Sequence, residues 1–548
     1  MRKRILAGLF CVAVLVTLSF TSPTERYFEI AKNLDIFATL FKEVNALYVD
    51  EVNPNKLVKT GIDAMLESLD PYTNYIPEDM VEDFRTMNTG QYGGIGAFTR
   101  EINNRTVVTM ILENYAAQRT GLKIGDEIIK IDHVDLSKLE AEEEGQLMKG
   151  QIGTPVSLTV RRMGSDQLLK LDFKREKIKV NNVPYFGMME NNVGYIQLLE
   201  FTPDAGKEVK NALIALKEKG AKALILDVRN NPGGLLFEAV NICNIFLPRG
   251  KLVVSTKGKI PEHNQNYETL NAPVDTEIPV AVLINRGSAS ASEIVAGTLQ
   301  DYDRAVVIGE KSYGKGLVQV SRPLSYNSQL KVTTAKYYTP TGRCIQVLDY
   351  SHRRDDGSVG TIPDSAKQSF KTAAGRQVFD GGGIDPDIKT VATVNHAIAQ
   401  KLFESGFIFD YATLYAFNHP SIAEPRAFSL TNEEYNQFTN WMKDKNYTYT
   451  SLLDRQMTEL NHEAKREKYY GDIKPQLDLI QAKIEESKKN ELQLYKDQIK
   501  KLLEEDIASR YYMEKGSVEV GFKYDQEIKK ASEVLLSSAQ YKKILNMK

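Results

Sequence analysis

The sequence predicts a multidomain α/β protein with helical regions at both ends. Apolar runs at residues 223–228, 280–284 and 305–309 alternate with helical patterns, as in a mainly parallel sheet that is buried on both faces. Residues 90–175 carry short strand-like runs between glycine-rich turns, which predict a small β-rich domain. Before residue 70 and after about residue 388, apolar residues recur at three- and four-residue spacing, which is typical of amphipathic helices.

Length and composition exclude several classes of protein. A chain of 548 residues is long enough for three or four domains. Its 70 basic and 72 acidic residues give no net positive charge for a nucleic-acid surface. Beyond residues 1–22 the cysteines are Cys243 and Cys344, too few for a disulfide framework. One disulfide between them stays open, but we expect free thiols that are buried in the fold.

Residues 1–22 predict a signal peptide or an N-terminal anchor. Three basic residues at positions 2–4 precede the apolar-biased residues 5–20, the order found in secretory signals. This run is shorter than the roughly 20 residues of a spanning helix, although an uncleaved membrane anchor through residues 5–20 stays open. We therefore expect export to the periplasm, with or without attachment to the inner membrane.

Residues 23–89 predict an N-terminal helical region. Its apolar face comprises Leu34, Phe37, Leu40, Phe41, Val44 and Leu47, and the sequence Leu-Asp-Pro-Tyr-Thr at 69–73 interrupts the pattern. We expect this region to have a structural role.

The β-rich segment at residues 90–175 resembles a PDZ domain. The resemblance rests on Tyr-Gly-Gly-Ile-Gly at 92–96, Gly-Leu-Lys-Ile-Gly-Asp-Glu-Ile at 121–128 and Gly-Gln-Ile-Gly-Thr at 150–154. It implies that a free peptide C-terminus adds to a sheet edge as a strand. The backbone amides of Gly94, Ile95 and Gly96 would then hold the carboxylate, and Ile95 and Phe98 suggest an apolar pocket.

Residues 176–388 form the predicted core, in which two strand-to-helix turns hold candidate functional groups. The first turn, Arg-Asn-Asn-Pro-Gly-Gly at 229–234, is equally consistent with an ordinary connection. The second contains Ser288, Ser290 and Ser292 just before a helical pattern. A serine there is a candidate nucleophile because helix N-terminal amides stabilise negative charge. Ser290-Ala-Ser-Glu293 also matches a capping box, which requires no catalysis.

Chain geometry predicts that a lysine returns to this serine. A helix over residues 290–302 rises about 18 to 20 Å, and a strand over residues 305–309 returns roughly 17 Å. The loop that follows, Glu-Lys-Ser-Tyr-Gly-Lys-Gly at 310–316, places Lys315 between two glycines. It lacks the order of a phosphate-binding loop.

The two segments together resemble the carboxyl-terminal processing (tail-specific) serine proteases, peptidase family S41. The resemblance rests on residues 287–293 and on Gly-Lys-Gly-Leu-Val-Gln at 314–319. It implies a core like that of crotonase and ClpP, with Ser290, Lys315 and Gln319 as the catalytic set. It also implies an oxyanion hole made by the Gly233 or Gly234 N–H and the Ala291 N–H. No cofactor is implied, and we expect no metal, because the acids at residues 381–387 are spaced for a turn.

A lysine base must be uncharged, so its pKa must fall by about three units from 10.4, which costs roughly 4 kcal/mol. Gln319 lies four residues after Lys315, so an extended chain puts both side chains on one face. Its amide can hold the amine without adding charge. The six histidines, at positions 133, 263, 352, 396, 419 and 462, lie in no catalytic motif.

Residues 389–548 predict a charged helical region that the resemblance does not explain. Its apolar stripe leaves two options open, packing within its own chain or homodimerisation. The stripe consists of Leu477, Ile480, Ile484, Leu492, Tyr495, Ile499, Leu502 and Ile507.

The function predicted from the sequence is that of an exported serine endopeptidase. It would bind the C-terminal tails of substrate proteins or peptides through a PDZ domain and cleave nearby with a Ser-Lys dyad. The main alternative is a catalytically inert, PDZ-containing periplasmic scaffold. An acyl-CoA enzyme with similar oxyanion geometry agrees less well with the PDZ-like segment and the export signal.

Overall fold

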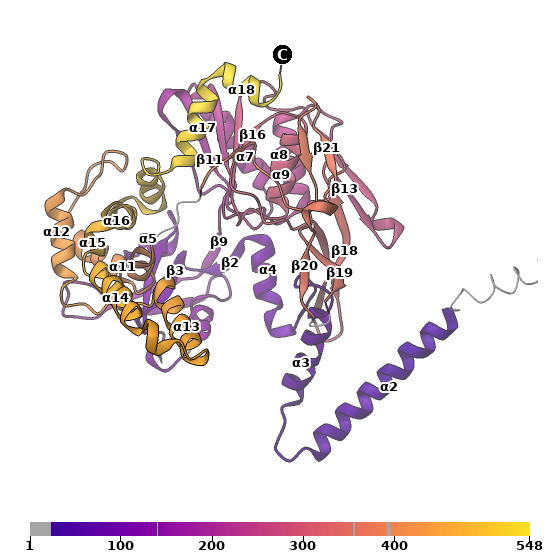
Figure 1. The fold of residues 1–548 in the computed structure, drawn as a ribbon, viewed down its shortest axis with the longest axis horizontal. Helices are drawn as coiled ribbons and strands as arrows, with labels where there is room; N and C mark the ends of the chain where they lie inside the picture. The colour runs from indigo at the N-terminus through magenta and orange to yellow at the C-terminus, as the bar shows by residue number, and fades with distance from the viewer. Residues whose placement is uncertain (1–22, 140, 355–356, 392–395, 548) are drawn as a thin grey trace, which may run out of the picture. The chain divides into compact units, whose positions relative to one another are not determined.

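The computed structural model describes residues 23–547, apart from residue 140 and the segments 355–356 and 392–395. The chain forms two compact units (Figure 1). One comprises Met1–Ile76 with Ser321–Val332, and the other Pro77–Val320 with Thr333–Lys548. Residues 5–20, the predicted signal or anchor, lie outside the described residues. Within the described part of the chain, no helix has the length and apolar character needed to cross a membrane.

The first unit contains the predicted N-terminal helices. Helix α2 spans Pro23–Leu47 and α3 spans Pro54–Glu67. Strand β1 (Asn74–Ile76) pairs antiparallel with one end of β18 (Gln329–Tyr338), where Tyr75 lies opposite Leu330. Asp70 explains the predicted break at 69–73, because its carboxylate accepts the N–H groups of Tyr72 and Thr73 and so fixes a turn.

The β-rich segment folds around its own sheet. Its main sheet has the order β3-β4-β5-β7-β8, with the short β6 beside β5. Val156, Leu158 and Val160 alternate toward its core. The strands are β2 (Gln91–Gly94), β3 (Ala97–Ile102), β4 (Arg105–Ile111), β5 (Glu127–Ile131), β6 (Val134–Asp135), β7 (Pro155–Arg161), β8 (Leu169–Lys174) and β9 (Glu176–Lys179); the helices are α4 (Val81–Thr89), α5 (Ala116–Arg119) and α6 (Ala141–Met148). Strands β2 and β9 pair antiparallel and form a separate two-stranded sheet.

The core sheet is mainly parallel, as predicted. Its order is β10-β11-β12-β15-β16-β23, and only β10 runs antiparallel to its neighbour. Every residue of β12 and β15 is buried, so both faces of the sheet must be covered. The strands are β10 (Tyr185–Met188), β11 (Val193–Gln197), β12 (Ala223–Asp227), β15 (Val280–Ile284), β16 (Val306–Gly309) and β23 (Ile388–Lys389).

Two sets of helices cover the sheet. Helices α7 (Ala205–Glu218), α8 (Leu236–Phe246) and α9 (Ala291–Asp301) pack on one face, against Val280, Val282 and Ile284. Helices α17 (Gln526–Leu536) and α18 (Ser538–Ile544) pack on the other, against Ala281 and Leu283 (Figure 1). The end of the chain thus supplies a layer of the core from outside the range predicted for it.

A second sheet lies beside α8 and α9 and contributes the strand that carries Gln319. Its five strands are β1, β13 (Leu252–Gly258), β14 (Gln265–Glu268), β17 (Leu317–Pro323) and β18. Two hairpins follow, formed by β19 (Leu348–Arg353) with β20 (Val359–Thr361) and by β21 (Ser369–Lys371) with β22 (Gln377–Phe379). Cys243 and Cys344 are free thiols, as predicted; Cys243 is buried and Cys344 is partly so.

The C-terminal region is helical, as predicted, and its apolar stripe packs within its own chain. Ile499 and Ile507 enter a core cluster with Ile408 and Tyr411, whereas Ile480 is half exposed. An ion pair between Arg105 and Asp410 joins the β-rich domain to these helices. The helices are α10 (Ala397–Glu404), α11 (Phe407–Asn418), α12 (Asn432–Trp441), α13 (Leu452–Arg466), α14 (Tyr470–Lys488), α15 (Glu491–Leu494) and α16 (Lys496–Gly521).

Candidate active site

Ser290 lies at the N-terminus of α9, six residues beyond the end of the buried strand β15. Its φ of 54° and ψ of −111° are values that residues other than glycine rarely adopt. Around it, Tyr337 donates its hydroxyl to the Ser290 carbonyl at 3.2 Å. The backbone at this serine is therefore held in a strained turn by its surroundings.

The three alternating serines differ in what their hydroxyls do. Ser288 is buried, donates its hydroxyl to the Val228 carbonyl and accepts the Asn285 N–H. Ser292 is buried and donates to the Asn231 carbonyl. Ser290 alone of the three is partly exposed. The hydroxyls of its two neighbours hydrogen-bond to backbone carbonyls, so Ser290 is the best candidate nucleophile of the three.

Glu293 links the serine to the lysine loop. It is fully buried on the first turn of α9. Its Oε2 accepts the backbone N–H groups of Ser290 at 2.8 Å and Lys315 at 2.9 Å. Its Oε1 accepts the Gly314 N–H at 2.6 Å and the Ser312 hydroxyl at 2.5 Å. One carboxylate oxygen therefore joins the backbone of both candidate catalytic residues, and the predicted return of the chain is confirmed.

The electrostatics of Glu293 follow from its burial. Removal from water raises the pKa of this carboxyl to about 7, although the four donors around it act in the opposite direction. A carboxylate with four donors is well satisfied when it is ionised. Near neutral pH, the protonated and the ionised form of the Glu293 carboxyl are therefore both populated.

Glycine is required on both sides of Lys315, as the sequence predicts. A Cβ on Gly314, whose φ is +86°, would lie 2.0 Å from Val347 Cγ2. A Cβ on Gly316 would lie 2.8 Å from the Gln346 backbone nitrogen, and the Gly316 N–H donates to Gln346 Oε1. The chain can pack this closely around Lys315 only without those side chains.

Gln319 lies on β17, partly buried. Its Nε2 donates to Thr333 Oγ1 on β18 at 3.1 Å. This bond fixes the orientation of the amide and leaves its oxygen end as the acceptor for an amine.

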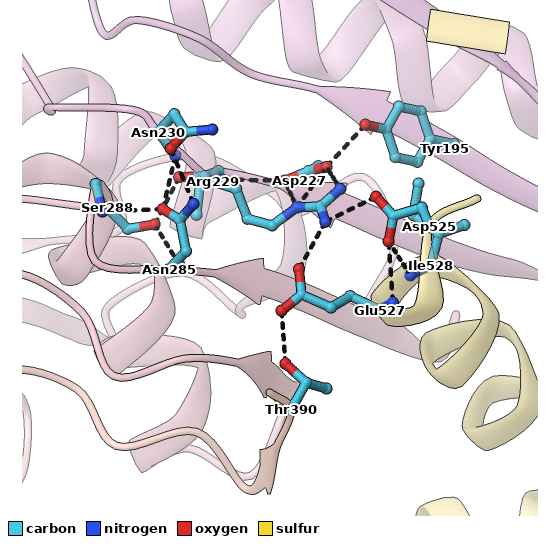
Figure 2. Close-up of polar contacts among 12 residues, drawn as sticks. Tyr195, Asp227, Arg229, Asn230, Asn285, Ser288, Thr390, Asp525, Glu527 and Ile528 are labelled. Carbon is cyan, nitrogen blue, oxygen red and sulfur yellow. Dashed lines mark hydrogen bonds and ion pairs between the residues drawn. The ribbon is translucent and has the colours of Figure 1, made fainter. Parts of the chain in front are cut away.

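The turn at residues 230–234 is bound to the serine turn along its length. Asn230 accepts from Asn285 Nδ2 and donates its N–H to Asn285 Oδ1, and Ser288 lies beside this pair (Figure 2). The Ala289 N–H donates to the Asn231 carbonyl. The two turns thus form one hydrogen-bonded unit at the carboxyl edge of the sheet, where ligands bind in such folds.

Gly233 of this turn lies against Ser290. A Cβ on Gly233 would lie 2.9 Å from Ser290 Cβ and 2.8 Å from the Ala291 nitrogen. The Gly233 N–H is occupied, because it donates to Asn231 Oδ1 at 2.9 Å. The Gly234 and Ala291 N–H groups have no acceptor among the described residues. Of the three predicted oxyanion amides, these two are available to a ligand.

The six histidines lie elsewhere. His396 and His419 stack on Tyr495 and Tyr415 in the C-terminal helices, and His352 pairs with Asp349 on the surface. In the described ranges, no histidine hydrogen-bonds to Ser290. The acids predicted to shape a turn pair with bases: Asp385 with Lys311, and Asp387 with Arg376.

The β-rich domain has a groove of about 340 Å³ at the predicted loop. Its walls include Ile95, Ala97 and Phe98 on one side and Gly145 and Met148 of α6 on the other. In the part of the chain that the structure describes, the Ile95 and Gly96 N–H groups have no acceptor. An extended peptide would find an apolar channel there with two unpaired amides at one end.

Sequence reasoning missed the residues that connect these parts. Glu293 was noticed only as half of a capping box, and that cap exists, since the carboxylate accepts the Ser290 N–H. Its contacts with Ser312 and Lys315 cross about 20 residues of sequence and leave no local signal. The available hint was a glutamate that directly precedes the apolar residues Ile294, Val295 and Ala296.

Comparisons with known proteins show which families and domains this chain resembles. Family models match at residues 192–350 for peptidase family S41, 93–173 for the PDZ domain, and 398–535 for a C-terminal helical domain of probable PDZ-proteases. A carboxy-terminal-processing protease of Bartonella bacilliformis is 38% identical over 344 residues, 62% of this chain and 79% of that protein. A probable CtpA-like serine protease of Staphylococcus aureus is 34% identical over 429 residues, 77% of this chain and 84% of that protein. The solved structure of a photosystem II D1 C-terminal processing protease has 24% sequence identity and a TM-score of 0.34, covering 68% of this chain and 96% of its own.

Proposed function

This chain belongs to the carboxy-terminal-processing serine proteases of peptidase family S41, and on that basis we propose that it cleaves peptide bonds with a dyad of Ser290 and Lys315. The observation that carries the proposal is the shared contact with Glu293, whose Oε2 accepts the backbone N–H of both residues. Because the backbone N–H groups of Ser290 and Lys315 donate to the same Glu293 oxygen, the two backbones stay close together.

In the proposed reaction the neutral Lys315 amine takes the Ser290 hydroxyl proton as the oxygen attacks the scissile carbonyl. The ammonium then gives that proton to the leaving amine, and an acyl-enzyme remains. Water attacks the ester with the same lysine as base, which releases the new C-terminus and restores the serine. Gln319 orients the amine through its amide oxygen, while its nitrogen is held by Thr333.

The tetrahedral intermediate carries an oxyanion that needs donors fixed in advance. We assign this role to the Ala291 N–H with the Gly234 N–H, because the Gly233 N–H already donates to Asn231. Gly233 keeps its importance as the residue against which Ser290 packs.

Substrate recognition is proposed to begin at the PDZ groove. The free tail of a protein would add as a strand beside β3, with its carboxylate on the unpaired amides of Ile95 and Gly96. Export to the periplasm remains part of the proposal on the basis of residues 1–22, and cell fractionation of the full-length chain tests it.

Substitutions with a matched lysine control test the proposed dyad. Ser290→Ala should lower cleavage of an unfolded protein by roughly a thousandfold or more, Lys315→Ala nearly as far, and Gln319→Ala less. Lys311→Ala, in the same loop and paired with Asp385, should cleave like wild type. A fluorophosphonate should label Ser290, located by mass mapping. Cleavage that survives in Ser290→Ala would refute the assignment, and a wild type that neither cleaves nor reacts would favour the inert scaffold.

A further inference from the structure

Arg229 lies where the candidate oxyanion turn meets the C-terminal helices. Its guanidinium bonds to Asp227 at the end of β12, and its Nη1 contacts Asp525 at 2.8 Å and Glu527 at 2.6 Å (Figure 2). The side chain is only 17% exposed. Asp525 and Glu527 lie at the start of α17, nearly 300 residues away in sequence.

Each outer carboxylate divides its two oxygens between a local partner and Arg229. Asp525 Oδ1 caps α17 by accepting the Glu527 and Ile528 N–H groups, while its Oδ2 reaches Arg229. Glu527 Oε1 accepts the Thr390 hydroxyl, while its Oε2 reaches Arg229. The position of the guanidinium is thus set by two groups that are themselves fixed.

Arg229 is followed directly by the turn that contacts the nucleophile. The next residue, Asn230, has a φ of 57° and is doubly bonded to Asn285. The carbonyl of Asn231 then accepts the Ala289 N–H. A shift of Arg229 would therefore also move Asn230 and Asn231, which hydrogen-bond to the turn before Ser290.

We propose that Asp525 and Glu527 are positioning residues for catalysis, which hold Arg229 so that residues 230–234 keep the oxyanion amides in place. This inference rests on the proposed function and assigns a role to the C-terminal helices. A merely stabilising role is the competing explanation, because removing the partners of a buried charge is itself destabilising, and kcat measured beside stability separates the two. Helix α17 is already anchored by Ile528, Ala531 and Val534.

The test removes charge while it keeps the local hydrogen bonds. In the double variant Asp525→Asn/Glu527→Gln, asparagine can still cap α17 and glutamine can still accept from Thr390. We expect kcat for a peptide to fall about tenfold or more with KM within twofold. The melting temperature should fall by only a few degrees, because Asp227 still pairs with Arg229. The rate of fluorophosphonate labelling should fall in parallel. Glu533→Gln, an exposed carboxylate on the same helix paired with Lys530, is the control and should match wild type.

A second measurement separates positioning from general damage. If the carboxylates act through Arg229, then adding both changes to Arg229→Gln should lower kcat no further than Arg229→Gln alone. An unchanged kcat in the double variant overturns the inference, and so does a full further loss in the Arg229→Gln background. Ser290→Ala, measured beside them, tests the proposed function independently: if it still cleaves, the dyad is wrong whatever the carboxylates do.

Discussion

Glu293 both caps helix α9 and contacts the loop that carries Lys315. It caps the N-terminus of α9 through the Ser290 N–H, which is the structural meaning of Ser-x-x-Glu. The same carboxylate also accepts from Ser312, Gly314 and Lys315. A cap ordinarily lies at a solvated helix end, whereas this one is buried and ties a second loop to the helix.

The roles of the alternating serines can be separated by a substitution beside the nucleophile. Ser288→Ala leaves the Val228 carbonyl and the Asn285 N–H without their hydroxyl partner, so the free energy of unfolding should fall by about 1 to 3 kcal/mol. Mass mapping should still find the fluorophosphonate on Ser290. Denaturant titration measures the first effect, and loss of all labelling in a folded Ser288→Ala protein would contradict the second.

Glu293 should also give stability a measurable pH dependence. Burial raises its pKa from the ordinary 4.5 to about 7, so between these values the folded chain binds a proton that the unfolded chain releases. Its contribution to stability is therefore fully present below pH 4.5 and is lost as pH rises through about 7. Glutamine cannot ionise, so the stability of wild type relative to Glu293→Gln should decline across this window. Parallel curves for the two proteins in denaturant titrations at several pH values would contradict the assignment, and Glu533→Gln should follow wild type.

The residue types of the site could be predicted, but their connections could not. The assignment of Ser290, Lys315 and Gln319 came from the family resemblance, whereas the return of the loop to the helix start followed from element lengths. That the Gly233 N–H is used by Asn231 depends on a side-chain rotation within a turn. Arg229 and Glu527 meet across 298 residues, a separation at which no local pattern remains.

At the scale of elements, α17 completes a sheet that the sequence predicted to be buried on both faces. The apolar runs of β12 and β15 required two covering layers, and this inference was correct. Alternate residues of β15 face α7, α8 and α9 on one side and α17 and α18 on the other. Which helix would cover the second face was not predictable, because several amphipathic helices follow residue 388 and all have suitable apolar stripes.

This covering role predicts that α17 is part of the folding unit of the protease core. Val534 is fully buried against the sheet, while Leu536 on the same helix is 51% exposed. Val534→Ala should lower the free energy of unfolding of the core by about 2 kcal/mol, and Leu536→Ala by less than about 0.5 kcal/mol. Hydrogen exchange of β12 and β15 amides is the measurement. Equal effects of the two substitutions would show that α17 is a dispensable appendage.

At the scale of the whole molecule, the order of segments follows the predicted function, with a tail-binding domain before a cutting domain. The PDZ domain does not stand alone, however. Besides the Arg105–Asp410 pair, its Asn103 side chain donates to the Ser405 carbonyl. Gln118 donates to the sulfur of Met513, where α16 departs from helical geometry. The C-terminal helices thus contact both the PDZ domain and, through α17, the core, which the sequence alone did not indicate.

If substrate tails enter the PDZ groove, their free carboxylate should lower KM. A large side chain in place of one glycine on α6 should block the groove. Gly145 lies on α6 at the groove, and a Cβ there meets no atom of the described residues within 4 Å, so Gly145→Leu should fill the groove without disturbing the fold. Gly471 on α14 is equally open and lies in a different region, so Gly471→Leu is a matched control for the loss of a helical glycine. The substrates are two peptides of one sequence, one with a free C-terminus and one amidated.

Wild type and Gly471→Leu should show a KM about tenfold higher for the amidated peptide, because the carboxylate loses its charge-assisted bonds to the loop amides. In Gly145→Leu the two peptides should be cleaved alike, with both KM values near that of the amidated peptide in wild type. Since the substitution lies outside the proposed dyad, fluorophosphonate labelling of Ser290 should continue at the wild-type rate. A Gly145→Leu enzyme that still prefers the free tail would place tail recognition elsewhere in the chain, and a wild type indifferent to amidation would remove it from the mechanism.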